Sequence, residues 1–307
     1  MEGGKFFPMN KLRQIGLLVC LVLSFVVGCG KKPPVVLSLY CSASHFPVAE
    51  ELAKTFRQVY GVTVVCIPMD DAAHPAFSTP EDRDSRKRTK KRRKTQRDVI
   101  FGSQQVQQLK IWMENAVYKD FSQFLLDHQS GDLYLCDSLV EVQQLDEFEL
   151  VLKTQPLAYL TPVLMVHQDK GPFYSVEEVL NSHETLGIVR REVGGLGRET
   201  DRFLQNLRHK DPNLSFNRLV VFDNETLLLE AWEDNQVAMV ICWDSTAARL
   251  FPEIGPVALP RTEVLAVPLT MCDLRSGGDY KIMEFFSIFA SSEKGQNFFK
   301  QFGYKVK

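Results

Sequence analysis

The sequence predicts an α/β fold in which mostly parallel sheets are flanked by helices. A strand–helix–strand order opens the chain after residue 34 and recurs in its middle, with short connections that favour parallel pairing. The length of 307 residues is enough for two α/β domains that each bury a core of their own. Apolar residues make up 45% of the chain and charged residues 24%, which is the composition of an ordinary globular protein.

The first strand–helix–strand unit begins with the apolar run Val35–Tyr40, which we interpret as a strand. Pro47 opens a helix, because proline is favoured in the first turn, and Gly61 ends it. The apolar residues between them keep helical spacing. The β-branched run Val62–Ile67 then predicts a second strand.

The rest of the chain continues this alternation after a charged interruption at residues 70–97. We expect further strands at Asp98–Phe101, Tyr159–Val166, Leu186–Val189, Leu219–Phe222, Val237–Cys242 and Val264–Leu269. We expect helices at Gln104–Asn115, from a capping box at Ser175–Glu178, from the loop Gly194–Gly197 to Leu207, from Asp223 or Asn224 through Trp232, and at Lys281–Ala290 and Glu293–Phe302.

The N-terminus has the pattern of an export signal. Three basic residues within the first 13 positions precede an uncharged apolar run, Ile15–Val27, whose thirteen residues are too few to span a bilayer comfortably. The run stops at Gly28 and Cys29, which resembles the signal of a bacterial lipoprotein. The resemblance implies that residues 1–28 are cut off and that the thiol of Cys29 carries lipid such as palmitate. Residues 29–34 then tether the protein to the membrane, and we expect it at the cell envelope, periplasmic or extracytoplasmic.

The formal net charge of −2 hides an uneven layout. Residues 81–97 contain ten Lys or Arg and three acids, so this segment carries +7 and the rest of the chain −9. One basic loop on an acidic body argues against a protein that coats nucleic acid, and we expect no nucleic-acid partner. The run Arg86–Lys94 has no apolar member to pack, so we interpret it as a solvated loop. Binding of this loop to anionic lipid or another polyanion is the alternative.

Five cysteines follow Cys29, at positions 41, 66, 136, 242 and 272. Their number is odd and their spacing matches no zinc site. Cys41 and Cys66 lie at the ends of two predicted strands and could come close. Buried free thiols are nevertheless the expected state for most of the five.

Four segments, taken in order, resemble a known family. They are Leu37–Ser44, Asp98–Ser103, Gly195–Arg198, and the closing pair Ser291–Gln296 and Phe302–Tyr304. Their order and spacing resemble type II periplasmic solute-binding proteins, and most of all the molybdate-binding branch, whose first strand ends in Ala-Ala-Ser and whose last helix ends in Tyr-Gly-Phe. The resemblance covers nearly the whole mature chain, from Val35 to Val306.

This resemblance implies two α/β lobes, each a mostly parallel sheet flanked by helices, with the ligand in the cleft between them. Lobe 1 would hold residues 35–163 and 259–307, including the basic loop 81–97, and lobe 2 would hold residues 164–258. The chain would cross between the lobes near Pro162 and near residues 259–268. Closure about these crossings is the usual motion of such a fold.

The resemblance also implies where the ligand is held. Ser44 matches the serine after the family's first strand, so its hydroxyl and the N–H groups of the following helix would donate to a bound oxyanion. The alternative is a Ser44 that only caps the helix. The family's serine loop after the second strand is replaced here by Pro68–Ala72, in which Asp70 and Asp71 would repel an anion. Ser78 and Thr79 are the candidates that would replace the lost donors if the loop folds back.

The second lobe would contribute two further elements. The candidate backbone donors are the N–H groups of Gly194, Gly195 and Leu196, with nearby arginines adding charge-assisted bonds; a flexible turn is the alternative. Where the family has a ligand tyrosine, this chain has Cys242, which is a poor donor. Trp243 and Asp244 follow it and are further ligand candidates, although a tryptophan at a strand end more often serves packing.

The sequence predicts no enzyme and no cofactor. It contains no metalloprotease, nucleophile-elbow, phosphate-loop or dinucleotide-binding motif, and its six histidines are scattered. The resemblance to solute-binding proteins and to a lipoprotein signal implies a lipid-anchored substrate-binding protein of an ABC-type importer that binds a molybdate-like oxyanion and docks on a membrane permease. One alternative is a metal-cation binder that uses Asp70, Asp71, His74 and Asp244. The other is an envelope lipoprotein of the same fold that has lost transport.

Overall fold

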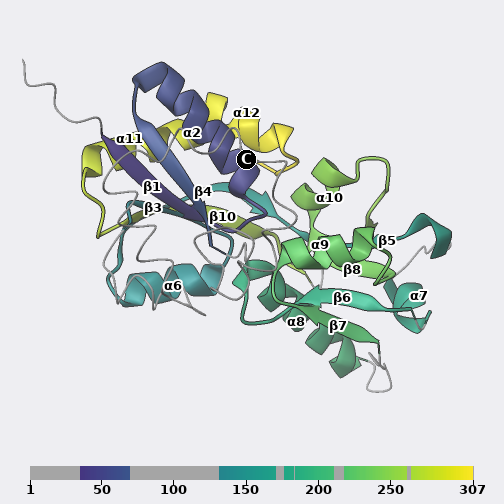
Figure 1. Cartoon of the computed structure of the whole chain (residues 1–307). Helices are drawn as coiled ribbons and strands as arrows, with labels where there is room; N and C mark the ends of the chain where they lie inside the picture. Colours follow the sequence, from purple (N-terminus) through teal and green to yellow (C-terminus); the bar gives the residue numbers. More distant parts are fainter. Residues whose placement is uncertain are drawn as a thin grey trace, which may run out of the picture. The chain divides into compact units, whose positions relative to one another are not determined.

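The computed structural model describes residues 35–69, 131–170, 176–182, 184–210, 218–260 and 264–306. From Val36 onward the chain forms one unit built on two five-stranded sheets (Figure 1). Several expectations lie outside the described residues. They are the signal peptide and tether with Cys29, the charged segment with Asp70, Asp71 and Ser78, the strand 98–101, the helix 104–115 and the capping residue Ser175.

The first sheet contains the predicted parallel unit. Its strands, in spatial order, are β2 (Thr63–Pro68), β1 (Val36–Cys41), β3 (Leu133–Cys136), β10 (Val267–Leu274) and β4 (Val151–Leu160). β1 pairs in parallel with β2 and with β3, whereas β10 runs antiparallel to β3 and β4. The strand–helix–strand prediction for the start of the chain is therefore confirmed.

Helices cover both faces of this sheet. α2 (Phe46–Tyr60), α11 (Tyr280–Ser291) and α12 (Glu293–Gln301) lie on one face and α6 (Leu139–Glu147) lies on the other (Figure 1). Alternate residues of β1 serve the two faces, as the twofold period of a strand requires. Leu39 packs in one core with Phe56 and Phe286, and Tyr40 packs in the other with Leu145.

The second sheet has the strand order β7 (Leu219–Phe222), β6 (Leu186–Val189), β8 (Met239–Trp243), β5 (Pro162–Val166) and β9 (Val257–Ala258). β6 is parallel to β7 and β8, and β5 is antiparallel to β8 and β9. The helices of this part are α7 (Val176–Asn181), α8 (Gly194–Lys210), α9 (Glu225–Glu233) and α10 (Asp244–Leu250), with a short 3₁₀ turn at Gln168–Lys170. Asn224, one of the two predicted caps, begins α9, because its side chain accepts the N–H of Leu227 at 2.8 Å.

The chain passes between the sheets close to the predicted crossings. The run 159–166, predicted as one strand, is two strands that divide at Thr161, since β4 pairs within the first sheet and β5 within the second. A second passage lies between β9 and β10. The C-terminal segment pairs with the end of β4 beside the first passage, where Lys305 and Tyr159 exchange backbone hydrogen bonds of 2.7 and 3.3 Å.

The sequence pattern does not predict β3, α6, α10, β9, the 3₁₀ turn or most of β4, and for the first three of these the physical reason is clear. β3 is a four-residue strand with every residue buried, which is too short to show a period. α6 buries only Glu141 and Leu145 and exposes Leu139 and Val140, so its apolar residues do not follow helical spacing. α10 follows β8 without any connecting residue, and the apolar strand conceals its start.

The described cysteines, including Cys41 and Cys66, are free thiols. Cys66 lies opposite Leu39 in the pairing of β1 with β2, so the two cysteines do not face each other. Among the described residues, no helix combines the length and the hydrophobicity needed to cross a bilayer.

Candidate functional site

The site lies where the carboxyl ends of strands from both sheets meet. β1 leads into Ser42–His45, β3 into Asp137, and β8 into Trp243, while α8 and α9 begin just after β6 and β7. A cavity of about 20 Å³ lies at this junction. On the side of the first sheet, the cavity is lined by Ser42, Ser44 and Asp137. On the side of the second sheet, it is lined by Val189, Val193, Gly194, Leu196, Glu225 and Trp243.

The Asp137 carboxylate is the centre of this junction. Its Oδ1 accepts the backbone N–H of Gly195 at 3.0 Å, and its Oδ2 accepts the indole N–H of Trp243 at 3.1 Å. His45 Nε2 lies 3.3 Å from the same Oδ2. Burial alone would raise the pKa of Asp137, but the His45 imidazole and the Gly195 and Trp243 donors outweigh it and hold that pKa below its usual value. Asp137 is therefore a stable buried carboxylate that joins the two sheets.

His45 connects this carboxylate to the C-terminal segment. Its ring is 1% exposed, and its Nδ1 lies 3.0 Å from the hydroxyl of Tyr304. Burial raises the pKa of Tyr304, so the phenol stays protonated at neutral pH. Tyr304, His45 and Asp137 form a continuous polar path from α12 to the start of α8.

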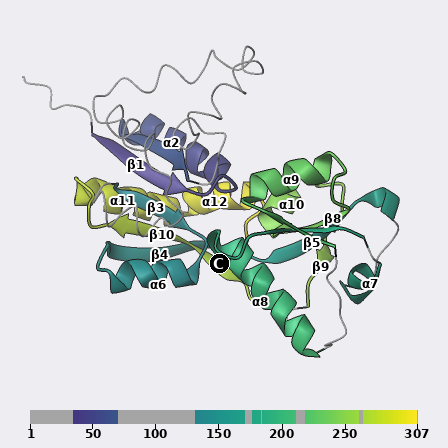
Figure 2. The ribbon, with the colours of Figure 1, turned by 60° about the horizontal axis from the view of Figure 1, so that its bottom comes forward.

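The glycines of α8 allow the two sheets to approach. The sequence predicts a loop at Gly194–Gly197, but α8 begins at Gly194, which has a φ of +58°. A Cβ on Gly195 would lie 1.9 Å from the carbonyl oxygen of Asp137, and one on Gly197 would lie 2.0 Å from that of Arg190. Only glycine permits these contacts, so Gly195 and Gly197 both serve close packing, and Gly195 also donates its N–H to Asp137. Figure 2 shows α8 starting beside the first sheet and running away along the second.

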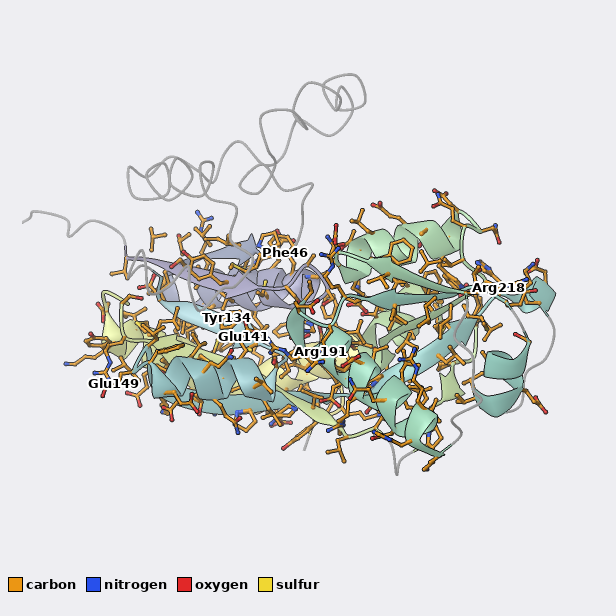
Figure 3. All side chains as sticks on the ribbon, turned by 90° about the horizontal axis from the view of Figure 1, so that it is seen from below. Phe46, Tyr134, Glu141, Glu149, Arg191 and Arg218 are labelled. Carbon is orange, nitrogen blue, oxygen red and sulfur yellow. The ribbon has the colours of Figure 1, made fainter. Side chains whose placement is uncertain are left out.

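A second contact between the sheets lies beside Asp137. Ser138 caps α6 by accepting the N–H of Glu141 at 3.3 Å, and its hydroxyl also accepts a short hydrogen bond from the Arg198 guanidinium of α8. Glu141 lies near Tyr134 of β3 (Figure 3), and burial raises its pKa. The start of α8 is thus held to the first sheet through both Gly195 and Arg198.

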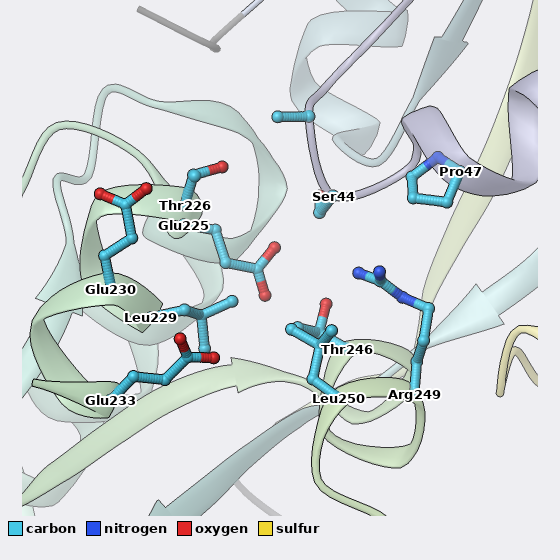
Figure 4. Close-up of a pocket in the computed structure, with 11 residues that line it drawn as sticks. Ser44, Pro47, Glu225, Thr226, Leu229, Glu230, Glu233, Thr246, Arg249 and Leu250 are labelled. Atoms are coloured by element: carbon cyan, nitrogen blue, oxygen red, sulfur yellow. The ribbon is translucent and has the colours of Figure 1, made fainter. Parts of the chain in front are cut away.

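A larger cavity of about 240 Å³ opens next to the small one. Ala43, Ser44 and Pro47 line it from the first sheet, and residues of α9 and α10 line it from the second. The side chains of Glu225, Thr246 and Arg249 point into it (Figure 4). Ser44 and Glu225 line both cavities, so the two spaces form one site with a narrow inner end and a wider outer part.

Glu225 is the second buried carboxylate of the site. It is 5% exposed, and its Oε1 accepts the backbone N–H of Trp243 at 3.2 Å. Its Oε2 is buried and accepts no hydrogen bond from a described residue. Burial raises the pKa of Glu225, and the Trp243 N–H, the nearby His45 ring and the Thr246 and Ser44 hydroxyls offset this only in part. A buried carboxylate oxygen without a donor is costly, unless a ligand supplies the donor.

The structure brings together most of the predicted second-lobe residues with Ser44. The Ser44 hydroxyl lies 2.8 Å from that of Ser42 and does not cap α2, whose N-cap is His45. Gly194, Leu196 and Trp243 line the small cavity, and the Gly195 N–H bonds Asp137. These placements locate the residues, while their contact with a ligand stays a prediction.

Two predicted residues lie elsewhere. Cys242 is fully buried on β8 and lines neither cavity, and burial raises the pKa of its thiol far above the usual value. Asp244 faces the crossing between the sheets: its Oδ1 accepts the N–H of Thr161 at 2.9 Å, and its Oδ2 pairs with Lys305 at 2.7 Å. Asp244 therefore fixes the crossing and does not face the cavities. No group of three or more His, Cys, Asp or Glu suited to a metal ion occurs in the described part of the chain.

Four charged or titratable residues of the site are not marked by any sequence motif: His45, Asp137, Glu225 and Arg249. Two of them could have been found from their position just after a predicted or observed strand. Asp137 directly follows the buried strand β3, and Glu225 opens the helix that follows β7, so both stand at the carboxyl edges of parallel strands. Ligands of open α/β sheets bind at such edges.

Two helix-flanked sheets, joined by crossing segments and lining one site together, define a two-lobed solute-binding protein. The chain belongs to the bacterial extracellular solute-binding proteins, since the sequence model of that family matches residues 91–305. The expected resemblance to type II periplasmic binding proteins is thus confirmed. The family consists of binding proteins that serve ABC-type importers and act outside the cytoplasm.

Solved structures support the same fold. The periplasmic molybdate-binding protein of Azotobacter vinelandii matches with a TM-score of 0.63 at 12% identity, over 88% of this chain and 99% of that one. The sulfate-binding protein SubI of Mycobacterium tuberculosis gives 0.61 at 10% identity, over 88% and 86%. Iron-bound HitA of Pseudomonas aeruginosa gives 0.56 at 14% identity, over 87% and 85%. At such low sequence identity, the structural similarity establishes the fold and not the ligand. A search of curated proteins by sequence finds no match.

Proposed function

We propose that this protein is a lipid-anchored receptor that binds one small solute between its two lobes and delivers it to an ABC permease. The observation that supports the proposal most directly is the cavity of about 240 Å³ lined from both sheets. A solute in that cavity would contact both lobes at once, and its binding energy would stabilise the closed arrangement. The lipid on Cys29 would keep the receptor near the permease, and this part of the proposal comes from the sequence.

The test is a thermal-shift screen of the full chain, purified in detergent, against small solutes of different charge. A solute that binds only the folded protein stabilises it by about 2.7 kcal/mol at a hundred times its dissociation constant. The proposal predicts at least one saturable rise in the melting temperature. If no oxyanion, metal ion, amino compound or organic acid gives one at millimolar concentration, the receptor proposal fails, and an envelope lipoprotein without a transport role becomes the better account.

A molybdate-like oxyanion is the ligand that the resemblance of the sequence favours. Supporting it, the Gly195 and Trp243 N–H groups already hold a carboxylate, so they are able to bind an anion. Two observations weigh against it. The space beside these donors is about 20 Å³, which holds about one water molecule and no tetrahedral oxyanion. Asp137 and Glu225 would also repel the anion. Oxyanion binding therefore requires Asp137 to move away.

A further inference from the structure

The outer cavity has an excess of negative charge that calls for a cationic group. Three glutamates, Glu225, Glu230 and Glu233, line it together with one arginine, Arg249. Glu230 and Glu233 are exposed, and with Thr226 they lie on one face of α9, at helical spacing of three and four residues. Among the described residues, none forms an ion pair with these four side chains, although the His45 ring acts on the charge of Glu225 and Arg249 acts on the Tyr304 phenol. The cavity thus presents charges whose partners would come from a ligand.

Glu225 gives the cavity a defined cation position. Its Oε2 is buried, accepts no hydrogen bond of normal length from a described residue, has only the neutral Ser44 and Thr246 hydroxyls nearby, and belongs to a side chain that is 5% exposed. An ammonium group offers three donors and a full positive charge, so it would satisfy this oxygen and compensate its charge. A neutral donor would leave the charge of the buried carboxylate uncompensated.

Arg249 gives the cavity a defined anion position on the opposite side. Its guanidinium points into the cavity from α10, facing the carboxylate of Glu225, with the Thr246 hydroxyl between them (Figure 4). A planar guanidinium binds a carboxylate with two parallel hydrogen bonds. One ligand with a carboxylate at one end and an ammonium group nearby would engage both residues.

We infer that the site takes an amino acid with a basic side chain. Its α-carboxylate would bind Arg249, its α-ammonium group Glu225, and its side-chain cation the exposed pair Glu230 and Glu233. The volume of about 240 Å³ lies below the roughly 300–1,000 Å³ of pockets for drug-sized ligands, and so suits a metabolite of this size. The inference rests on the proposed function, because it names the solute that the receptor would bind.

The test is titration calorimetry of the full chain in detergent with L-lysine, L-arginine, L-alanine, putrescine and molybdate. The inference predicts that a basic amino acid binds most tightly, that L-alanine is weaker because it lacks the side-chain cation, and that putrescine is weaker because it lacks the carboxylate. Glu225→Gln and Arg249→Gln should each lower the affinity for the basic amino acid by about 10- to 100-fold, which is the effect of losing one charge-assisted hydrogen-bond partner. Glu147→Gln, an equal charge change at an exposed position of α6, should leave the affinity unchanged.

Two results would overturn the inference. One is the absence of binding by either basic amino acid at millimolar concentration. The other is binding that Glu225→Gln and Arg249→Gln both leave unchanged. If molybdate or another solute binds the wild type instead, the receptor proposal stands and only the ligand class is wrong. If no solute of the broader thermal-shift screen binds, the receptor proposal fails as well.

Discussion

Gly195 donates its backbone N–H to the Asp137 carboxylate at 3.0 Å, across the junction of the two sheets. Gly195 lies in the first turn of α8, where unpaired N–H groups and the helix dipole favour an anion. The resemblance of the sequence to the family implies an external oxyanion at this position. The structure places a carboxylate of the chain itself there, so the same donors hold the two lobes together without a ligand.

Removal of the Asp137 side chain should leave an anion site behind. Asp137→Ala deprives Gly195, Trp243 and His45 of their shared acceptor, and we expect a loss of stability of about 3 kcal/mol. Formate, acetate or sulfate should then raise the melting temperature of the variant much more than that of the wild type. Thermal unfolding with and without these anions measures the effect.

The control for this rescue is Asp146→Ala, which removes an exposed carboxylate of α6. Its response to anions should equal that of the wild type. Equal anion responses in Asp137→Ala and Asp146→Ala would show that the donors around Asp137 do not form an anion site.

Glu225 should reduce the stability of the unliganded protein as the pH rises. Burial raises the pKa of Glu225 in the folded protein. The contribution of Glu225 to stability is therefore fully present only below its pKa in the unfolded chain, which is near 4.5. That stability is lost as the pH rises through the folded pKa. Glu225→Gln should therefore raise the melting temperature at neutral pH by about 1–3 °C and leave it nearly unchanged at pH 4. Thermal unfolding at both pH values measures this, and a variant less stable than the wild type at neutral pH would contradict it.

A side chain at Gly195 should force the lobes apart. In Gly195→Ala the new Cβ would meet the Asp137 carbonyl oxygen at 1.9 Å, and we expect a loss of about 1–3 kcal/mol together with weaker solute binding. Gly278→Ala is the matched control, because no atom lies within 4 Å of its Cβ position. Urea unfolding of the two variants tests the contact. Equal stabilities would mean that α8 does not approach Asp137 so closely in solution.

Lipid attachment should depend on Cys29 alone. Cys29→Ala removes the thiol to which the lipid would be joined, and we expect an uncleaved or soluble product without lipid. Membrane fractionation and metabolic labelling with palmitate measure both properties. A variant that still labels and still sediments with membranes would exclude Cys29 as the lipid site.

The sequence predicted the parts of the fold that repeat a local pattern. The unit from β1 to β2, the strands β6 and β7 and the two final helices show clear periods and clear end signals. Ser44 and the glycines of α8 could be placed at the site, because motifs of a known family mark them. The roles of Asp137 and Glu225 could not be predicted, because they depend on which strand ends meet across two sheets, and β3 itself is too short to be recognised.

The central claim, that a solute binds between the two lobes, is tested most directly by the fluorescence of Trp243. Its indole is fully buried, donates to Asp137 and lines the inner cavity, whereas Trp232 stacks on His167 with ring centroids 4.4 Å apart. Titration of the full chain with the solute found in the screen should change the emission in a saturable way. We predict that Trp112→Phe and Trp232→Phe each keep the change and that Trp243→Phe abolishes it. A saturable change of equal size in Trp243→Phe would contradict the account, because the solute would then bind away from the junction of the two sheets.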